Sequence, residues 1–134
     1  MRLYVLASIF VTLLLITIGC SSGTVKNVGV FKSAAGKGSQ ALSIGIQNYE
    51  DGKYITATKN LISALDLGLT VPGDVVQAHK HLAFIYCLSN REKMCRDEFR
   101  KVLEKDSQFD LKPEEAGHPI WGPVFRKVKA GRKK

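Results

Sequence analysis

The side chains that most often do chemistry are few in this chain, and their spacing does not favour a reaction. The three histidines are His79, His81 and His118. His79 and His81 are two residues apart, so on a helix they point to different faces and cannot share a metal ion as an i, i+4 pair does. Glu114 and Glu115 directly follow a proline, a position where acidic residues favour the start of a helix.

Motifs that would indicate catalysis are also missing from the sequence. It contains no glycine-rich phosphate loop and no serine-centred nucleophile motif. We therefore expect a protein that is not an enzyme, with no catalytic residue, no metal site and no cofactor.

The N-terminal segment is typical of an exported protein. Arg2 precedes an uncharged run over residues 3–18. This run has the length of the hydrophobic region of a signal peptide and is short for a membrane-spanning helix. Residues 1–19 are therefore predicted to be a signal peptide.

The end of that run carries the one cysteine that we expect to be modified. Gly19 and Cys20 resemble a bacterial lipobox, although Thr17 stands where leucine is usual. The resemblance implies that Cys20 is lipidated and becomes the N-terminus, and Ser21 after it favours sorting to the outer membrane. Ordinary signal cleavage and a retained anchor helix are the alternatives.

Charge is informative once export is assumed. The chain has 20 basic and 12 acidic residues, a net charge of +8. Such a balance suits nucleic acid, an anionic membrane or an acidic partner, but an exported protein does not meet the genome. Residues 20–39 are rich in serine, glycine and lysine without any acid, so we expect a flexible tether there and a folded domain over residues 40–134.

The expected domain contains an internal repeat. Apolar and small residues at helical spacing recur with the same offset of 38 residues: Ala57, Leu61, Ala64 and Leu65, then Cys95, Phe99, Val102 and Leu103. The same offset relates Gly45 to Ala83 and Gly52 to Asn90. Helix–turn–helix units that repeat in this way predict an all-α fold of stacked hairpins.

This repeat resembles the tetratricopeptide repeat, which places small residues where its two helices meet and a glycine in its turn. The resemblance implies two such units, with Ala57 and Ala83 at close helix contacts and Asn90 in the left-handed conformation of a turn glycine. It also implies that the first helix of each unit lines a protein-binding groove. By register, the groove residues are Leu42, Ile46, Tyr49, Glu50, Gln77, Lys80, Phe84 and Leu88.

Two further cysteines, Cys87 and Cys95, lie on either side of the second turn. Their spacing is not that of a redox motif. An antiparallel hairpin can bring them together, and the periplasm permits disulfides. Two readings are open, a disulfide and a pair of small buried thiols.

The C-terminal stretch has an apolar helical face. Trp121, Val124, Phe125 and Val128 fall at i, i+3, i+4 and i+7. A two-unit array needs its open end covered, so we expect this helix to cap the second unit, with Trp121 and Phe125 inward. The alternative is a free docking motif, and packing of the tail onto the groove aromatics is an alternative to their exposure.

Residues 79–129 carry a further resemblance. The elements "FIYC", "CRDEF" and "FDLKPEEAGHPIWGPVF" are similar to those of the TssQ-type lipoproteins encoded with bacterial type VI secretion systems. The resemblance implies a lipid-anchored scaffold or assembly factor on the periplasmic face of the outer membrane, binding a protein partner in an envelope complex. A pilotin-like chaperone for a channel subunit and a peptidoglycan-binding lipoprotein are the alternatives.

Overall fold

A computed structural model of the protein describes residues 34–132. All of them belong to one compact unit, Lys32–Lys134. The predicted signal peptide, Cys20 and residues 20–33 of the predicted tether lie outside the described residues. Over residues 34–132, no helix is long and apolar enough to cross a bilayer.

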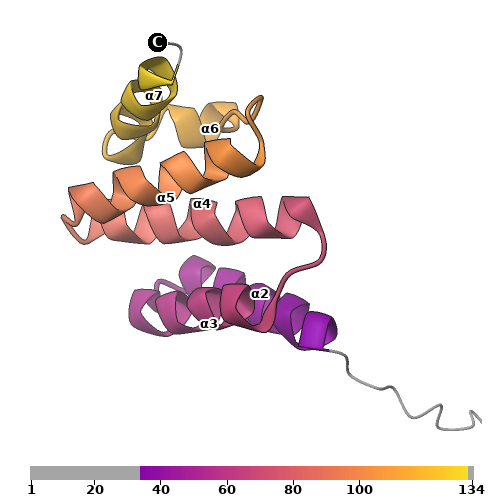
Figure 1. Cartoon of the computed structure of the whole chain (residues 1–134). Coiled ribbons are helices and arrows are strands. Elements are labelled where there is room, and N and C mark those ends of the chain that lie inside the picture. The colour runs from indigo at the N-terminus through magenta and orange to yellow at the C-terminus, as the bar shows by residue number, and fades with distance from the viewer. Residues whose placement is uncertain (1–33, 133–134) are drawn as a thin grey trace, which may run out of the picture. The chain divides into compact units, whose positions relative to one another are not determined.

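The described part of the chain consists of helices joined by turns and loops, with no strand between residues 34 and 132. Its helices are α2 (Ala34–Glu50), α3 (Tyr54–Leu67), α4 (Pro72–Leu88), α5 (Glu92–Lys105), α6 (Pro113–Ala116) and α7 (Trp121–Gly131). As Figure 1 shows, α2 pairs with α3 and α4 pairs with α5, and α7 covers the far side of α5. The predicted fold, two stacked helical hairpins with a C-terminal capping helix, is confirmed.

The two turns within the hairpins have the same geometry. Gly52 has a φ of 73° and Asn90 a φ of 57°, so Asn90 takes the left-handed conformation as predicted. In both turns the N–H that follows this residue donates to a carbonyl five residues back: Lys53 to Asn48 and Arg91 to Tyr86, each at 2.8 Å. These bonds satisfy the last carbonyls of α2 and α4, which would otherwise lack partners.

Small residues let the helices of each hairpin approach closely. A Cβ atom on Gly45 would lie 2.9 Å from the Leu61 side chain. Ala57 and Ala83 are completely buried, with 0% of each residue exposed. Leu61 and Phe99 fill the corresponding positions of the two hairpins and are also fully buried. The predicted repeat register is therefore correct at these positions.

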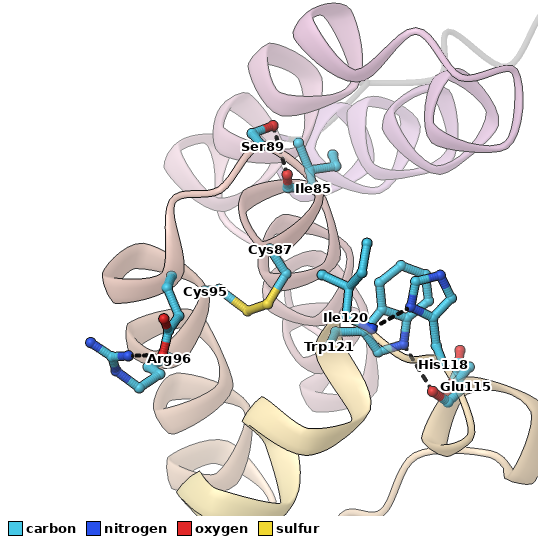
Figure 2. The surroundings of a disulfide bond; sticks show 10 residues. Ile85, Cys87, Ser89, Cys95, Arg96, Glu115, His118, Ile120 and Trp121 are labelled. Carbon is cyan, nitrogen blue, oxygen red and sulfur yellow. Dashed lines mark hydrogen bonds and ion pairs between the residues drawn. A yellow bond between two sulfur atoms is a disulfide. The ribbon is translucent and has the colours of Figure 1, made fainter.

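The second hairpin is also closed covalently. Cys87 near the end of α4 and Cys95 in α5 form a disulfide, with their Cα atoms 5.2 Å apart (Figure 2). Of the two readings open from the sequence, the structure has the disulfide. Both cysteines are part of the buried core beside Leu82 and Phe99.

Helix α7 covers the open end of the array. Trp121, Phe125 and Val128 are buried, with 8%, 2% and 8% of each residue exposed, and Val124 packs half-buried against the core. The Trp121 ring stacks on Phe84 of α4, with ring centroids 4.4 Å apart. The capping interpretation is therefore right for these residues, and the free docking motif is not observed.

The segment before α7 holds the indole in place. The Nε1–H group of Trp121 donates to the carbonyl of Glu115 at 2.9 Å (Figure 2). His118 stacks on the same indole with centroids 3.2 Å apart, and its Nδ1 accepts the N–H of Ile120. The turn after α6 thus contacts the Trp121 indole, which packs in the core.

The expected tether, residues 20–39, is wrong at its C-terminal end. Helix α2 begins at Ala34, six residues before the expected start of the domain. Gly38 lies on the buried side of α2, where a Cβ atom would be 2.4 Å from the Gly68 carbonyl oxygen and 3.2 Å from that of Ala64. This glycine serves a close backbone contact between α2 and the end of α3, whereas composition alone suggested flexibility.

Replacing Gly38 by alanine tests this contact. Alanine normally stabilises a helix interior relative to glycine by about 1 kcal/mol, but here the clash with backbone atoms should outweigh that gain. We expect Gly38→Ala to lower the free energy of unfolding by about 1–2 kcal/mol in a urea titration. Gly73→Ala is the control, because no atom lies within 4 Å of its added Cβ. Equal stability of the two variants would contradict the contact.

Replacing Trp121 by alanine tests the cap. Loss of the buried indole should lower the free energy of unfolding by about 3–5 kcal/mol. Ile120→Ala is the matched control, because Ile120 is 45% exposed. Trp121 is the only tryptophan, so its emission should be blue-shifted in the folded chain and red-shifted on unfolding. Red-shifted emission from the folded protein would rule the cap out.

Candidate functional site

A depression of about 460 Å³ lies between α2, α4 and the C-terminal segment. Six of the eight predicted groove residues line it: Ile46, Tyr49 and Glu50 from α2, and Gln77, Lys80 and Phe84 from α4. Helices α2 and α4 hold these side chains side by side because the two hairpins stack in the same register. The first helices of the two units therefore do share one concave surface.

The remaining two predicted groove residues lie elsewhere. Leu42 is buried in the core and borders a neighbouring depression of about 490 Å³, which shares Ile46 and Glu50 with the first one. Leu88, the last residue of α4, packs half-buried against the core and lines neither depression. The prediction that Leu88 lines the groove is therefore wrong. Register alone does not show that a residue at a helix end turns inward.

One wall of the groove comes from residues that the sequence analysis did not assign to it. Lys112, Glu114, Glu115 and Trp121 of the C-terminal segment line the depression opposite α2, and His81 of α4 lines its floor. From the sequence this segment was expected to be a cap, with a free docking motif or packing on the groove aromatics as alternatives. The presence of acids and a tryptophan in one short stretch was the available signal, but their position depends on how the chain returns across α4.

The aromatic residues of the groove are less exposed than expected. Phe84 is only 2% exposed because Trp121 stacks on it, so the expectation of an open Phe84 is wrong and the tail covers this ring. Tyr49 is half-buried, with its ring edge-on to His81 at 5.2 Å. Burial, together with Tyr54 and Glu115, raises the pKa of Tyr49 to about 12, so its hydroxyl stays protonated. Within residues 34–132 that hydroxyl makes no hydrogen bond.

A buried ion pair ties the groove floor to its wall. The Lys80 ammonium lies 2.6 Å from a carboxylate oxygen of Glu115, with the two side chains 6% and 18% exposed. The same ammonium is 5.6 Å from the centre of the Phe84 ring, within reach of a cation–π interaction. The other oxygen of Glu115 accepts the backbone N–H of Lys112 at 3.1 Å. Breaking this pair would leave a charge nearly buried without a partner.

A second buried polar cluster joins α4 to α5 away from the groove. His79 Nδ1 lies 2.6 Å from one Glu98 oxygen, and the Lys101 ammonium lies 2.7 Å from the other. Burial alone would raise the pKa of the Glu98 carboxyl, but the hydrogen bonds from His79 and Lys101 hold it below its usual value. Glu98 is therefore an anion at neutral pH, and His79 Nδ1 is the donor.

His81 has a different hydrogen-bond partner from His79, although the two are close in sequence. Its Nδ1 lies 2.7 Å from the carbonyl oxygen of Gln77, one turn earlier in α4. Burial lowers the pKa of the His81 imidazole, an effect that the Gln77 hydrogen bond opposes. A neutral ring that donates from Nδ1 fits this position, and the ring is in a T-shaped contact with Tyr49.

Over residues 34–132 there is no group of three or more histidine, cysteine or acidic side chains that could hold a metal ion. Every buried side-chain polar atom of the described residues has a hydrogen-bond partner. In comparisons with known proteins, no protein family, curated protein or solved structure matches this chain.

Glu98→Gln tests the buried cluster through its pH dependence. The pKa of Glu98 is lower in the folded than in the unfolded chain, so its ion pair stabilises the fold above about pH 4.5 and less as the pH falls below that value. The glutamine variant should lose about 1–2 kcal/mol at neutral pH and show a shallower loss of stability in acid. Thermal unfolding at several pH values measures both effects.

Glu104→Gln is the control for this variant, since Glu104 is exposed in the last turns of α5. It should reproduce the stability of the unmodified protein between neutral pH and pH 4. If both variants keep the same acid dependence as the unmodified protein, Glu98 is not held as an anion in the fold.

Proposed function

We propose that this chain is a non-enzymatic lipoprotein, anchored through Cys20 on the periplasmic face of the outer membrane, that binds a protein partner in its concave groove. Its role would be that of a scaffold or assembly factor accessory to a type VI secretion system. The lipobox-like end of the signal sequence supports the anchor, and the similarity of residues 79–129 to TssQ-type lipoproteins supports the secretion system.

One observation carries the binding part of the proposal: the groove is lined from three directions. Helices α2 and α4 supply its floor, and the segment around α6 supplies a wall with Glu115 and Trp121. The volume of about 460 Å³ suits several side chains of a helix or an extended strand more than a folded domain. Tyr49 adds a half-buried ring with a protonated hydroxyl, a residue type that is frequent at interface hot spots.

The disulfide supports the proposed compartment. Cys87 and Cys95 are bonded in the structure, and disulfides persist in the periplasm but are rare in the cytosol. Stability that depends on this bond would be available only after export.

Site-specific photo-crosslinking in intact cells that express the secretion system tests the proposal. A photoreactive residue at Glu50 or Gln77, both in the groove, should form an adduct with one protein of the envelope complex. The same residue at Lys59, on the exposed side of α3, is the matched control and should give no such adduct.

The anchor is tested in the same cells. Cys20→Ala should release the protein from the membrane fraction or leave its precursor uncleaved, with a weaker adduct at Glu50. Adducts of equal strength at Glu50 and Lys59 would show that the groove is not the binding surface. A groove adduct with a channel subunit alone, formed only before that subunit reaches the outer membrane, would favour a pilotin-like chaperone.

A further inference from the structure

The basic residues of the chain are not spread evenly over its surface. Residues 121–132 contain four basic residues and no acidic one, and two more lysines follow at 133 and 134. The loop and turn before them, residues 106–120, contain four acids and one lysine. The end of the domain thus changes sign within a short length of chain.

The basic residues of α7 meet others on α5. A shallow depression of about 450 Å³ is lined by Arg96 and Arg100 from α5, by Lys127 from α7 and by Arg132 directly after α7, with Val128 and Gly131 between them. All four polar residues of its lining are cationic. None of its lining residues also lines the protein-binding groove, so the two sites occupy different surfaces of the domain.

Two of the basic residues of this depression form ion pairs with exposed acidic residues of α5. Arg96 is paired with Glu92 and Arg100 with Asp97, each within one turn of α5 and each with a partner side chain at least 41% exposed. Exposed pairs of this kind contribute little free energy, so the guanidinium groups can turn to another anion at small cost. Lys127 has no ion pair or hydrogen bond within residues 34–132. Arg132 uses one N–H group on the carbonyl of Leu103.

The groove has a mixed lining. Three carboxylates, from Glu50, Glu114 and Glu115, border it together with two lysines, Lys80 and Lys112, and Lys80 is paired with Glu115. The charged residues of the α5–α7 depression are all basic, so a ligand with several negative charges is attracted there more strongly than to the groove. The separation of charge makes the depression a site for a second, anionic ligand.

We propose that the α5–α7 depression binds the phosphate groups of anionic phospholipids at the membrane surface. Guanidinium and ammonium groups together bind phosphate through charge-assisted hydrogen bonds. The choice of lipid rests on the proposed Cys20 anchor, because residues 20–33 can span at most about 45 Å from the bilayer to α2. Acyl chains and a basic patch are the kind of paired signals that give stable membrane attachment.

Such a contact would also orient the domain. The depression lies on α5 and α7, whereas the groove is lined by α2, α4 and the segment that contains α6. With the basic surface on the headgroups, none of the groove residues is needed for membrane contact. The groove then stays accessible to a partner while the domain is held at the bilayer.

Vesicle sedimentation tests the proposal without the anchor. The probe protein is residues 32–134, the compact unit that contains the whole described core, and thermal unfolding first checks that each variant is folded. We expect it to sediment with phosphatidylcholine vesicles that contain about one-third phosphatidylglycerol, at least tenfold more strongly than with phosphatidylcholine alone, and to be released by high salt.

Two double variants of equal charge separate this site from net charge. Arg100→Glu with Lys127→Glu should weaken binding to the anionic vesicles by about tenfold or more. Lys53→Glu with Lys59→Glu, both exposed on the first hairpin, should change it by less than about threefold. The same three proteins are also sedimented with purified peptidoglycan.

The outcomes distinguish the proposals. Equal losses in the two double variants, or no preference for anionic vesicles, would overturn the lipid site. Loss of peptidoglycan binding in the Arg100/Lys127 variant with vesicle binding unchanged would also overturn it and make the depression a cell-wall site. If vesicle binding fails but the crosslink at Glu50 forms, the lipid site is wrong and the proposed groove function stands, because the crosslink does not depend on the basic surface.

Discussion

A stack of only two helical hairpins leaves a large apolar face at its open end, and covering that face is the constraint on which the rest of this structure depends. The cover is the stacking of Trp121 on Phe84, extended by Phe125 against Phe99. For the indole to reach Phe84, the chain must return from the end of α5 across α4. The loop, α6 and the Gly117–Pro119 turn make that return, and the Lys80–Glu115 pair fixes it to α4. The same returning segment also forms the wall of the groove.

The local features of the fold followed from the sequence because each is decided within a few residues. Gly52 and Asn90 occupy the same position in the two hairpin turns, and both have a positive φ. The small residues at Ala57 and Ala83 indicated helix contact because larger side chains do not fit at that spacing. The apolar face of α7 was also a property of consecutive residues, and so the inward direction of Trp121 could be predicted.

The features that the sequence did not reveal depend on contacts between distant residues. Lys80 and Glu115 are 35 positions apart, and nothing in either local pattern indicates that they meet. His79 and Glu98 likewise pair across the second hairpin. The glycine-rich sequence around Gly38 suggested a flexible tether. In the folded chain, however, Gly38 lies against the backbone of Gly68, and this contact leaves no room for a side chain. Six of the eight predicted groove residues line one depression because register fixes helix faces. Leu42 borders a neighbouring depression, and Leu88 lines neither because register does not fix helix ends.

The wall of the groove and the cap of the array share Trp121 and belong to one continuous stretch of chain. An occupant that touches Trp121 and Glu115 therefore adds its own binding free energy to the closure of the open end, by the linkage that relates any ligand to the stability of the state it binds. The reverse also holds: a fluctuation that lifts α7 removes Trp121 from the groove and would weaken binding of the proposed partner. Occupancy of the groove and closure of the open end would then be linked, so a higher concentration of that partner would raise the fraction of molecules with the C-terminal helix in place.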